Sequence, residues 1–237
     1  MSSAIETCEL TVEFHSDVKA LQKLDLRVAQ GEVYGFIGPN GAGKTTTMHV
    51  LLGFIAATSG SASIFGVDVR KSIARQRIGY MPEHPQTYAF LTGRELLIMA
   101  GRLFGMGGKF LSDRAEELIE KVGLSEAKNR RIAGYSRGMM QRIALAQALI
   151  NDPDLVILDE PTSGFDPIGR IEIREIISEL KRAGKTVFFS SHELSEVEKV
   201  CDRVGIIARG RLVAEGGISA LVKGGESLEQ YFIRTLS

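Results

Sequence analysis

The sequence predicts an α/β fold in which a mixed or parallel sheet is interrupted by a helical insertion. Three observations lead to this prediction. An apolar run at 32–37 is followed by a glycine-rich loop and a helix-like stretch. A second run, Leu155 to Leu158, is apolar at every position, as is typical of a central parallel strand buried on both faces. Between the two runs, helical periodicity replaces the alternation of strands and helices.

The glycine-rich loop has the pattern G-x-x-x-x-G-K-[ST], and we expect it to bind a nucleotide. Its residues are Gly38, Pro39, Asn40, Gly41, Ala42, Gly43, Lys44, Thr45 and Thr46. Backbone N–H groups of such a loop turn towards phosphate oxygens, and the following helix N-terminus adds partial positive charge. Lys44 can reach the β- and γ-phosphates, and Thr45 can place its hydroxyl on Mg²⁺. The strand before the loop and the helix after it disfavour the alternative of a turn that binds nothing.

Composition limits the partners that we expect. The 237 residues suffice for one large domain, or a domain with an inserted subdomain, and 44% of them are hydrophobic. Lys+Arg and Asp+Glu both number 29, so no basic excess indicates a nucleic-acid partner. Two cysteines, Cys8 and Cys201, make neither a disulfide framework nor a zinc quartet. We see no signal peptide and no run of roughly 20 apolar residues, so we expect the chain to associate with a membrane only through a partner.

The N-terminal half is predicted as short strands. Alternating patterns occupy much of 4–36, and further strands are expected at 61–65 and 78–81, with a basic surface helix at 69–77 between them. Phe14 lies in an early strand, where its ring could stack on a purine or pack in the core; residue preference does not decide between the two. Glu83 and His84 lie in a proline-bounded loop after the strand at 78–81.

Residues 85–153 are predicted to form the inserted helical subdomain. Thr92 to Glu95 has capping-box spacing, Gly105 to Gly108 interrupts the pattern, and a second capping box predicts a helix over 113–122. Ser136 is expected to begin a third helix that ends before Pro153.

After the insertion, strands and helices alternate again. We expect helices at 166–183 and 192–200, a strand at 186–189 and a hairpin at 204–215. The predicted organisation is therefore a core of 1–84 and 154–216, the insertion at 85–153, and a short helical tail at 217–237.

Three polar side chains follow predicted core strands, at the edge where open α/β folds bind ligands. Asp159 directly follows the apolar run and can hold Mg²⁺, while Glu160 can act as the general base for an attacking water. His192 follows the strand at 186–189 and can donate a hydrogen bond to the γ-phosphate. Taken alone, His192 would more often be an exposed helix-start histidine.

Together these motifs resemble an ATP-binding-cassette ATPase over essentially the whole chain. Tyr135 to Arg142 is similar to the family's Leu-Ser-Gly-Gly-Gln signature, with strict matches at Ser136 and Gly138. The run 160–167 resembles the stretch from the catalytic glutamate into the D-loop, and His192 and Phe14 fall at the switch histidine and the purine-stacking aromatic. The resemblance implies a P-loop NTPase (RecA-like) core with an N-terminal antiparallel β-subdomain and the inserted helical subdomain.

The resemblance also implies a mechanism and partners. Ser136 and Gly138 would contact the γ-phosphate of ATP held by a second ATPase domain, so that MgATP closes a head-to-tail homodimer or a pair with another chain. The ATPase would sit at the cytoplasmic face of a membrane and power transport through separate membrane-spanning subunits. Ser-Arg-Gly-Met signatures suggest export. The alternatives are a soluble family member, such as an iron–sulfur assembly ATPase, and a nucleotide-binding regulatory module that does not hydrolyse.

Glu83 departs from the family pattern, which usually has glutamine there as a ligand of Mg²⁺. A glutamate can also offer an oxygen to the ion, but it adds negative charge close to Asp159, Glu160 and the phosphates. We expect Glu83 to remain a metal ligand; the alternative is that its side chain turns away and only the loop keeps a coupling role.

Overall fold

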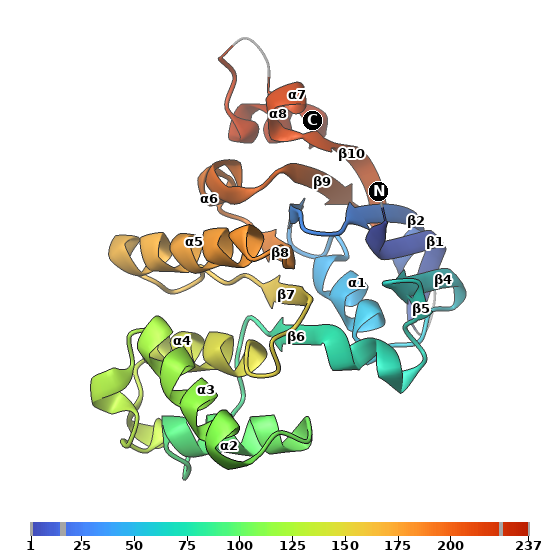
Figure 1. Ribbon diagram of the computed structural model, residues 1–237. Coiled ribbons are helices and arrows are strands. Elements are labelled where there is room, and N and C mark those ends of the chain that lie inside the picture. The colour runs from blue at the N-terminus through green and yellow to red at the C-terminus, as the bar shows by residue number, and fades with distance from the viewer. Residues whose placement is uncertain (1, 15–17, 223–224, 237) are drawn as a thin grey trace.

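The computed structural model describes residues 2–14, 18–222 and 225–236, which form two sheets with helices between and beside them (Figure 1). The central sheet has the strand order β10-β9-β3-β8-β7-β6. Its strands are β3 (Val33–Ile37), β6 (Ile78–Met81), β7 (Leu155–Asp159), β8 (Thr186–Ser191), β9 (Arg203–Ala208) and β10 (Arg211–Gly217). Only β10 runs antiparallel to its neighbour among these described pairs.

The inner strands of the central sheet are buried throughout. Every residue of β3, β7 and β8 is buried, which explains why their sequences are nearly continuous apolar runs rather than alternating ones. Because β3, β6, β7 and β8 are parallel, their carboxyl ends lie at one edge of the sheet. The segments that follow these strands therefore emerge close to one another, as the sequence predicts.

The second sheet is the predicted antiparallel β-subdomain, with the order β2-β1-β4-β5. Its strands are β1 (Ser3–Phe14), β2 (Val18–Ala29), β4 (Ser59–Ile64) and β5 (Val67–Asp68). Helix α1 (Lys44–Leu51) lies between this sheet and the central one, and its Met48 and Leu51 join one core cluster with Tyr34, Phe36 and Phe188. Helix α1, which follows the phosphate loop, is thus packed between the two sheets.

The remaining helices are α2 (Gly93–Leu103), α3 (Gly108–Lys121), α4 (Arg137–Ala148), α5 (Pro167–Arg182), α6 (Leu194–Val200), α7 (Ile218–Leu221) and α8 (Leu228–Leu236), with short 3₁₀ turns η1 (Ser72–Arg77), η2 (Ser125–Ala127) and η3 (Ile132–Gly134). Helices α4, α5 and α6 pack against β6, β8 and β3 of the central sheet, whereas α2 and α3 pack against α4 (Figure 1). Leu96, Leu118 and Leu145 of the helical part share one buried cluster with Leu158 and Phe189 of the sheet. The helical part is therefore packed onto the core, and the boundary at 85–153 remains a prediction.

Several helix starts have the caps that the sequence predicts. The Thr92 hydroxyl accepts from Glu95 N at 3.2 Å while the Glu95 carboxylate accepts from Thr92 N at 2.8 Å, so the capping box is complete. The Ser136 hydroxyl caps α4 by accepting from Met139 N, and the Asp166 carboxylate caps α5 by accepting from Gly169 N. These caps satisfy backbone donors that a helix N-terminus leaves without partners.

Three predicted boundaries are wrong. Helix α3 begins at Gly108 rather than Asp113, because an ion pair from Lys109 to Asp113 and burial of Leu111 extend it towards its N-terminus. The expected helix at 69–77 is only the 3₁₀ turn η1, preceded by the short strand β5.

Helix α6 starts two residues after His192 because the backbone of Glu193 is not helical (φ −92°, ψ 84°). The helical tail predicted at 217–237 contains α7 and α8, and its residues 223, 224 and 237 lie outside the described residues.

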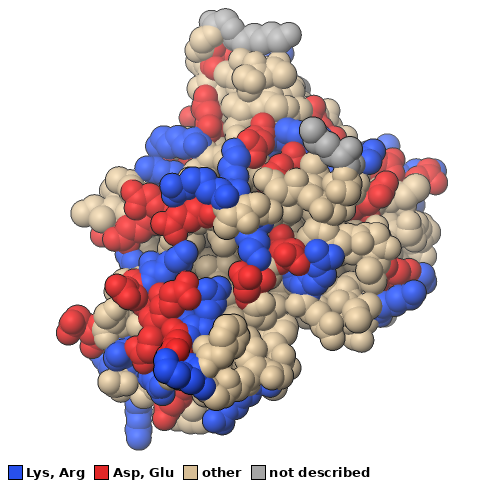
Figure 2. All heavy atoms as spheres, viewed as in Figure 1, with Lys and Arg blue, Asp and Glu red and all other residues tan. Residues whose placement is uncertain are grey.

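The surface carries charges of both signs. Figure 2 shows Lys and Arg side chains interspersed with Asp and Glu on the face displayed there. Many of them form pairs between elements, such as Arg94 and Lys128 with Glu116, and Lys121 with Glu179. Within the described ranges, no helix combines the length and the apolar character needed to cross a bilayer.

A glycine sets the contact between β6 and the end of α4. A Cβ added at Gly79 would lie 1.9 Å from the carbonyl oxygen of Ala148 and 2.9 Å from the Pro153 ring. We expect Gly79→Ala to lower the free energy of unfolding by about 1–3 kcal/mol, because backbone has to shift to relieve the overlap. Gly107→Ala is the control, since its backbone is extended (φ −165°) and nothing lies within 4 Å of the added carbon. Equal urea midpoints for the two variants would contradict this packing.

Candidate active site

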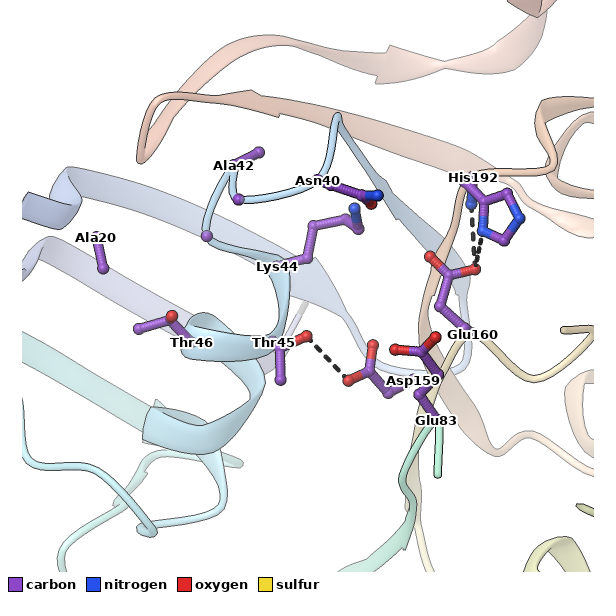
Figure 3. Close-up of a pocket in the computed structure, with 12 residues that line it drawn as sticks. Ala20, Asn40, Ala42, Lys44, Thr45, Thr46, Glu83, Asp159, Glu160 and His192 are labelled. Carbon is purple, nitrogen blue, oxygen red and sulfur yellow. Dashed lines mark hydrogen bonds and ion pairs between the residues drawn. The ribbon is translucent and has the colours of Figure 1, made fainter. Parts of the chain in front are cut away.

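A cavity of about 380 Å³ lies at the carboxyl edge of the central sheet (Figure 3). It brings together most of the residues that the sequence singles out. Its lining consists of Ala20, Asn40, Gly41, Ala42, Gly43, Lys44, Thr45, Thr46, Glu83, Asp159, Glu160 and His192. Ala20, on β2, is the one lining residue that sequence reasoning missed, and an alanine in an alternating strand gives no signal for such a role.

The phosphate loop needs glycine where the chain turns most tightly. A Cβ at Gly38 would lie 2.2 Å from the carbonyl oxygen of Ile207, and Gly43 has φ +113° with Ala20 O only 2.8 Å from the position of a Cβ. Lys44 is 8% exposed, and its ammonium donates to Gly38 O at 2.7 Å and Pro39 O at 3.3 Å. Among the described residues no carboxylate forms an ion pair with Lys44, so its charge is available to an anion in the cavity.

Asp159 and Thr45 form an oxygen pair beneath this loop. Asp159 is 3% exposed, and one of its carboxylate oxygens accepts from the Thr45 hydroxyl at 3.0 Å (Figure 3). Its other carboxylate oxygen accepts from the Ser190 hydroxyl at 2.6 Å. Burial and the negative charge of Asp159 raise the pKa of the neighbouring Tyr80 to about 12, so that phenol stays neutral.

The oxygen donors suit Mg²⁺, although they are too few to enclose it. In the described part of the chain, no group of three or more His, Cys, Asp or Glu side chains is placed to hold a metal ion. Mg²⁺ is commonly bound through one or two carboxylates, phosphate oxygens and water. The hydroxyl of Thr45 and the carboxylate of Asp159 fit that pattern beside a phosphate-binding loop.

Glu160 and His192 form a pair at the other side of the cavity. Glu160 is 6% exposed, and the contact between its carboxylate and His192 Nδ1 is 2.7 Å; His192 N also donates to that carboxylate at 3.2 Å (Figure 3). The His192 side chain is 58% exposed. Glu160 has φ +52°, an uncommon backbone conformation for a residue with a side chain and a frequent one at functional sites.

Ser190 is a second residue whose role sequence reasoning missed. Its hydroxyl donates to Asp159 and accepts from Glu160 N at 3.0 Å, so one fully buried side chain orients both acids. A polar residue near the end of an otherwise apolar strand was the available signal.

Glu83 reaches the cavity from the loop after β6. Figure 3 shows its side chain directed into the cavity beside Asp159. Its carboxylate also lies 3.7 Å from His84 Nε2, and its backbone oxygen accepts from Gln141 Nε2 at 2.9 Å. The loop that carries Glu83 is therefore tied to α4 of the helical part.

The other predicted residues do not line this cavity. Phe14 ends β1 and is 43% exposed, on the hairpin whose second strand carries Ala20. Ser136 is exposed and borders a separate hollow with Glu83 and Gln141. A Cβ added at Gly138 would have no described atom within 4 Å apart from its own turn of helix. Within one chain, the start of α4 does not join the phosphate loop.

Comparisons with known proteins agree on one family. The sequence model described as ABC transporter matches residues 21–163. An uncharacterised ABC transporter ATP-binding protein of Nostoc sp. is 48% identical over 207 residues, covering 86% of this chain and 62% of the relative. The bacitracin transport ATP-binding protein BcrA of Bacillus licheniformis is 45% identical over 219 residues, covering 91% of this chain and 70% of the relative. The chain thus spans about two thirds of the length of these curated relatives.

A solved structure described as the ATP binding subunit of an ABC transporter has the same fold. It superposes with a TM-score of 0.92 and 28% sequence identity, covering 99% of this chain and all of the other. This likeness confirms the predicted α/β fold with its antiparallel sheet and helical part.

The bridging hydroxyl of Ser190 is testable. We expect Ser190→Ala to lower the rate of ATP hydrolysis about tenfold, because it leaves a carboxylate oxygen of Asp159 and the backbone N–H of Glu160 buried without partners. Thr186→Val is the control, since it removes a buried hydroxyl that accepts from Gly31 N at the far end of the same strand. Steady-state phosphate release measures both, and equal rates in the two variants would count against the bridge.

Proposed function

The chain belongs to the ABC transporter family as one of its ATP-binding, ATP-hydrolysing subunits, and on that premise we propose that it powers export through separate membrane-spanning subunits. The proposal is supported by one observation: Lys44, Asp159, Glu160 and His192 line the same cavity. The Ser-Arg-Gly-Met form of the 136–139 segment supports export over import.

The phosphate end of the nucleotide is proposed to lie against the loop from Gly38 to Thr46. Backbone N–H groups at the start of α1 and the ammonium of Lys44 provide positive charge there. The purine is proposed to stack on Phe14, whose exposed ring lies on the hairpin bordering the cavity. Thr45, Asp159 and Glu83 are the proposed metal-side residues; Mg²⁺, when bound, supplies charge that neutralises phosphate oxygens.

Glu160 is proposed to polarise the attacking water, and His192 is proposed to donate a hydrogen bond to the γ-phosphate. Because Nδ1 of His192 faces Glu160, Nε2 is the ring atom that remains for the phosphate. The carboxylate of Glu160 thereby has two tasks: it orients the imidazole and it receives a proton from water. Lys44 and His192 together stabilise charge on the γ-phosphate.

A second ATPase domain is proposed to complete the site. Ser136 and Gly138 lie outside the cavity of their own chain, and the start of α4 presents backbone donors and a positive dipole end to the surface. In a head-to-tail homodimer, or a pair with a related chain, these residues would face the γ-phosphate of the other subunit. ATP would then favour the closed pair because it binds that state better. Through its membrane partners the chain would reside at the cytoplasmic face.

The proposed general base gives a direct test. We expect Glu160→Gln to bind ATP but to hydrolyse it at least about 100-fold more slowly, because the amide cannot accept the proton of water. The variant should accumulate as an ATP-bound dimer, visible by light scattering after size-exclusion chromatography. Glu175→Gln, which changes an exposed acid on α5, should behave as wild type. Wild-type turnover in Glu160→Gln would refute the assignment.

The role of Glu83 is testable through the metal. If Glu83 offers an oxygen to Mg²⁺, Glu83→Ala should raise the Mg²⁺ concentration needed for half-maximal ATPase activity several-fold, while Glu83→Gln retains an oxygen ligand and changes it less. Titrating Mg²⁺ at fixed ATP measures the effect. An unchanged Mg²⁺ dependence in both variants would remove Glu83 from the metal site.

A further inference from the structure

One guanidinium, that of Arg170 near the start of α5, lies between the two chain segments that carry Glu160 and His192. Its Nη1 is 2.5 Å from Glu193 Oε2, and its Nε donates to the backbone oxygen of Phe165 at 3.3 Å. Phe165 belongs to the segment after Glu160, and Glu193 directly follows His192. We propose that Arg170 is a positioning residue that sets the place of His192 relative to Glu160.

The segment between Glu160 and Phe165 is short and hydrogen-bonded. Ser163 N donates to Glu160 O at 3.0 Å, and Phe165 N donates to Thr162 O at 3.3 Å. These bonds make two successive turns, so a displacement of Phe165 is passed to Glu160. Together with the Glu160–His192 contact, the turns and Arg170 close a ring of contacts around the proposed catalytic pair.

The histidine depends on this ring because little else holds it. Its side chain is 58% exposed, whereas the Glu193 side chain is 18% exposed and the Arg170 side chain 35%. Glu193 occupies the N-cap position of α6, yet its side chain makes no capping hydrogen bond there and is turned to Arg170 instead. An acidic side chain at a helix start ordinarily caps it or faces solvent, so its pairing with α5 fixes the backbone just after His192.

Arg170 is the charge partner of a buried oxygen. Glu193 Oε2 is buried and has no hydrogen-bond partner beyond this ion pair among the described residues. Removing Arg170 therefore leaves a buried carboxylate oxygen without its opposite charge, and the carboxylate has to turn towards water. Glu193 N donates to Ser191 Oγ at 2.9 Å, so a shift of Glu193 that accompanies this turn is passed to the residues on both sides of His192.

The chain contains a matched pair one helical turn further along. Arg174 forms an ion pair with Glu196, again joining α5 to α6, and Lys199 also contacts Glu196 at 3.2 Å. Glu196 is more buried than Glu193, with an 8% exposed side chain. Arg174 has no described contact with the segments of Glu160 or His192. Its substitution therefore measures how much an ion pair between these two helices contributes to stability, apart from any effect on the catalytic pair.

The test combines two arginine variants with a histidine background. The proposal rests on the roles proposed above for Glu160 and His192. We expect Arg170→Met to lower kcat about tenfold, because a small displacement of a catalytic group has a large effect on rate, while KM for ATP and the thermal midpoint stay close to those of Arg174→Met. In a His192→Ala background, Arg170→Met should lower kcat by a smaller factor, since the part of its effect that passes through the imidazole is absent and only the part passed to Glu160 through Phe165 remains. Arg170→Lys, which retains the charge, should recover part of the rate.

The outcomes separate this inference from the proposed function. Wild-type turnover in His192→Ala would refute the role of the histidine and this inference with it. If His192→Ala is impaired but Arg170→Met lowers kcat equally in both backgrounds, or no more than Arg174→Met does, only the inference is overturned. Should Arg170→Met fail to fold, Glu193→Gln replaces it, because it removes the same ion pair with an isosteric side chain; it is judged by the same two comparisons.

Discussion

The register of three parallel strands, β3, β8 and β7, holds the whole site at one edge of the molecule. Ile37 pairs with Ser191, 154 positions later (191 − 37), and Asp159 pairs with Ser190, 31 positions later, so residues from three separate parts of the chain end their strands side by side. Phe188 of the middle strand packs against Tyr34 and Phe36 of β3, with ring centroids 5.8 Å and 5.3 Å apart. A slip of one residue would turn every side chain of a strand to the opposite face and would break these ring contacts, so the specific packing of the aromatic side chains favours one register, and the register fixes the cavity.

Sequence reasoning succeeded where the signal is local. The phosphate loop, the capping box at Thr92 and the fully apolar strand at 155–158 each depend on a few consecutive residues whose chemistry leaves little choice. It failed where packing between elements decides, as at the start of α3, where Leu111 is buried beside Gly101 of α2. The bridge made by Ser190 and the pairing of Arg170 with Glu193 also could not be read from spacing, because each joins side chains from different elements. The roles of the site residues remain predictions, since geometry alone places them together without showing their chemistry.

Helix α4 connects two parts of the proposed mechanism. Ser136 caps its first turn, and Gln141, just over one turn later, holds the backbone oxygen of Glu83 at 2.9 Å. Gln141 is 2% exposed, so this bond is sheltered from water. A shift of α4 would therefore be transmitted to the proposed metal side of the cavity by one hydrogen bond, which holds the main chain of Glu83 whatever the orientation of its side chain.

The ammonium of Lys44 is bonded to the loop's own carbonyl oxygens at Gly38 and Pro39. An ammonium has three N–H donors, so one donor of Lys44 is left for an anion in the cavity. The two bonds to the loop fix the direction of the lysine and the curvature of the loop before an anion binds. Binding therefore adds an acceptor without displacing one, and it requires little reorganisation of the loop.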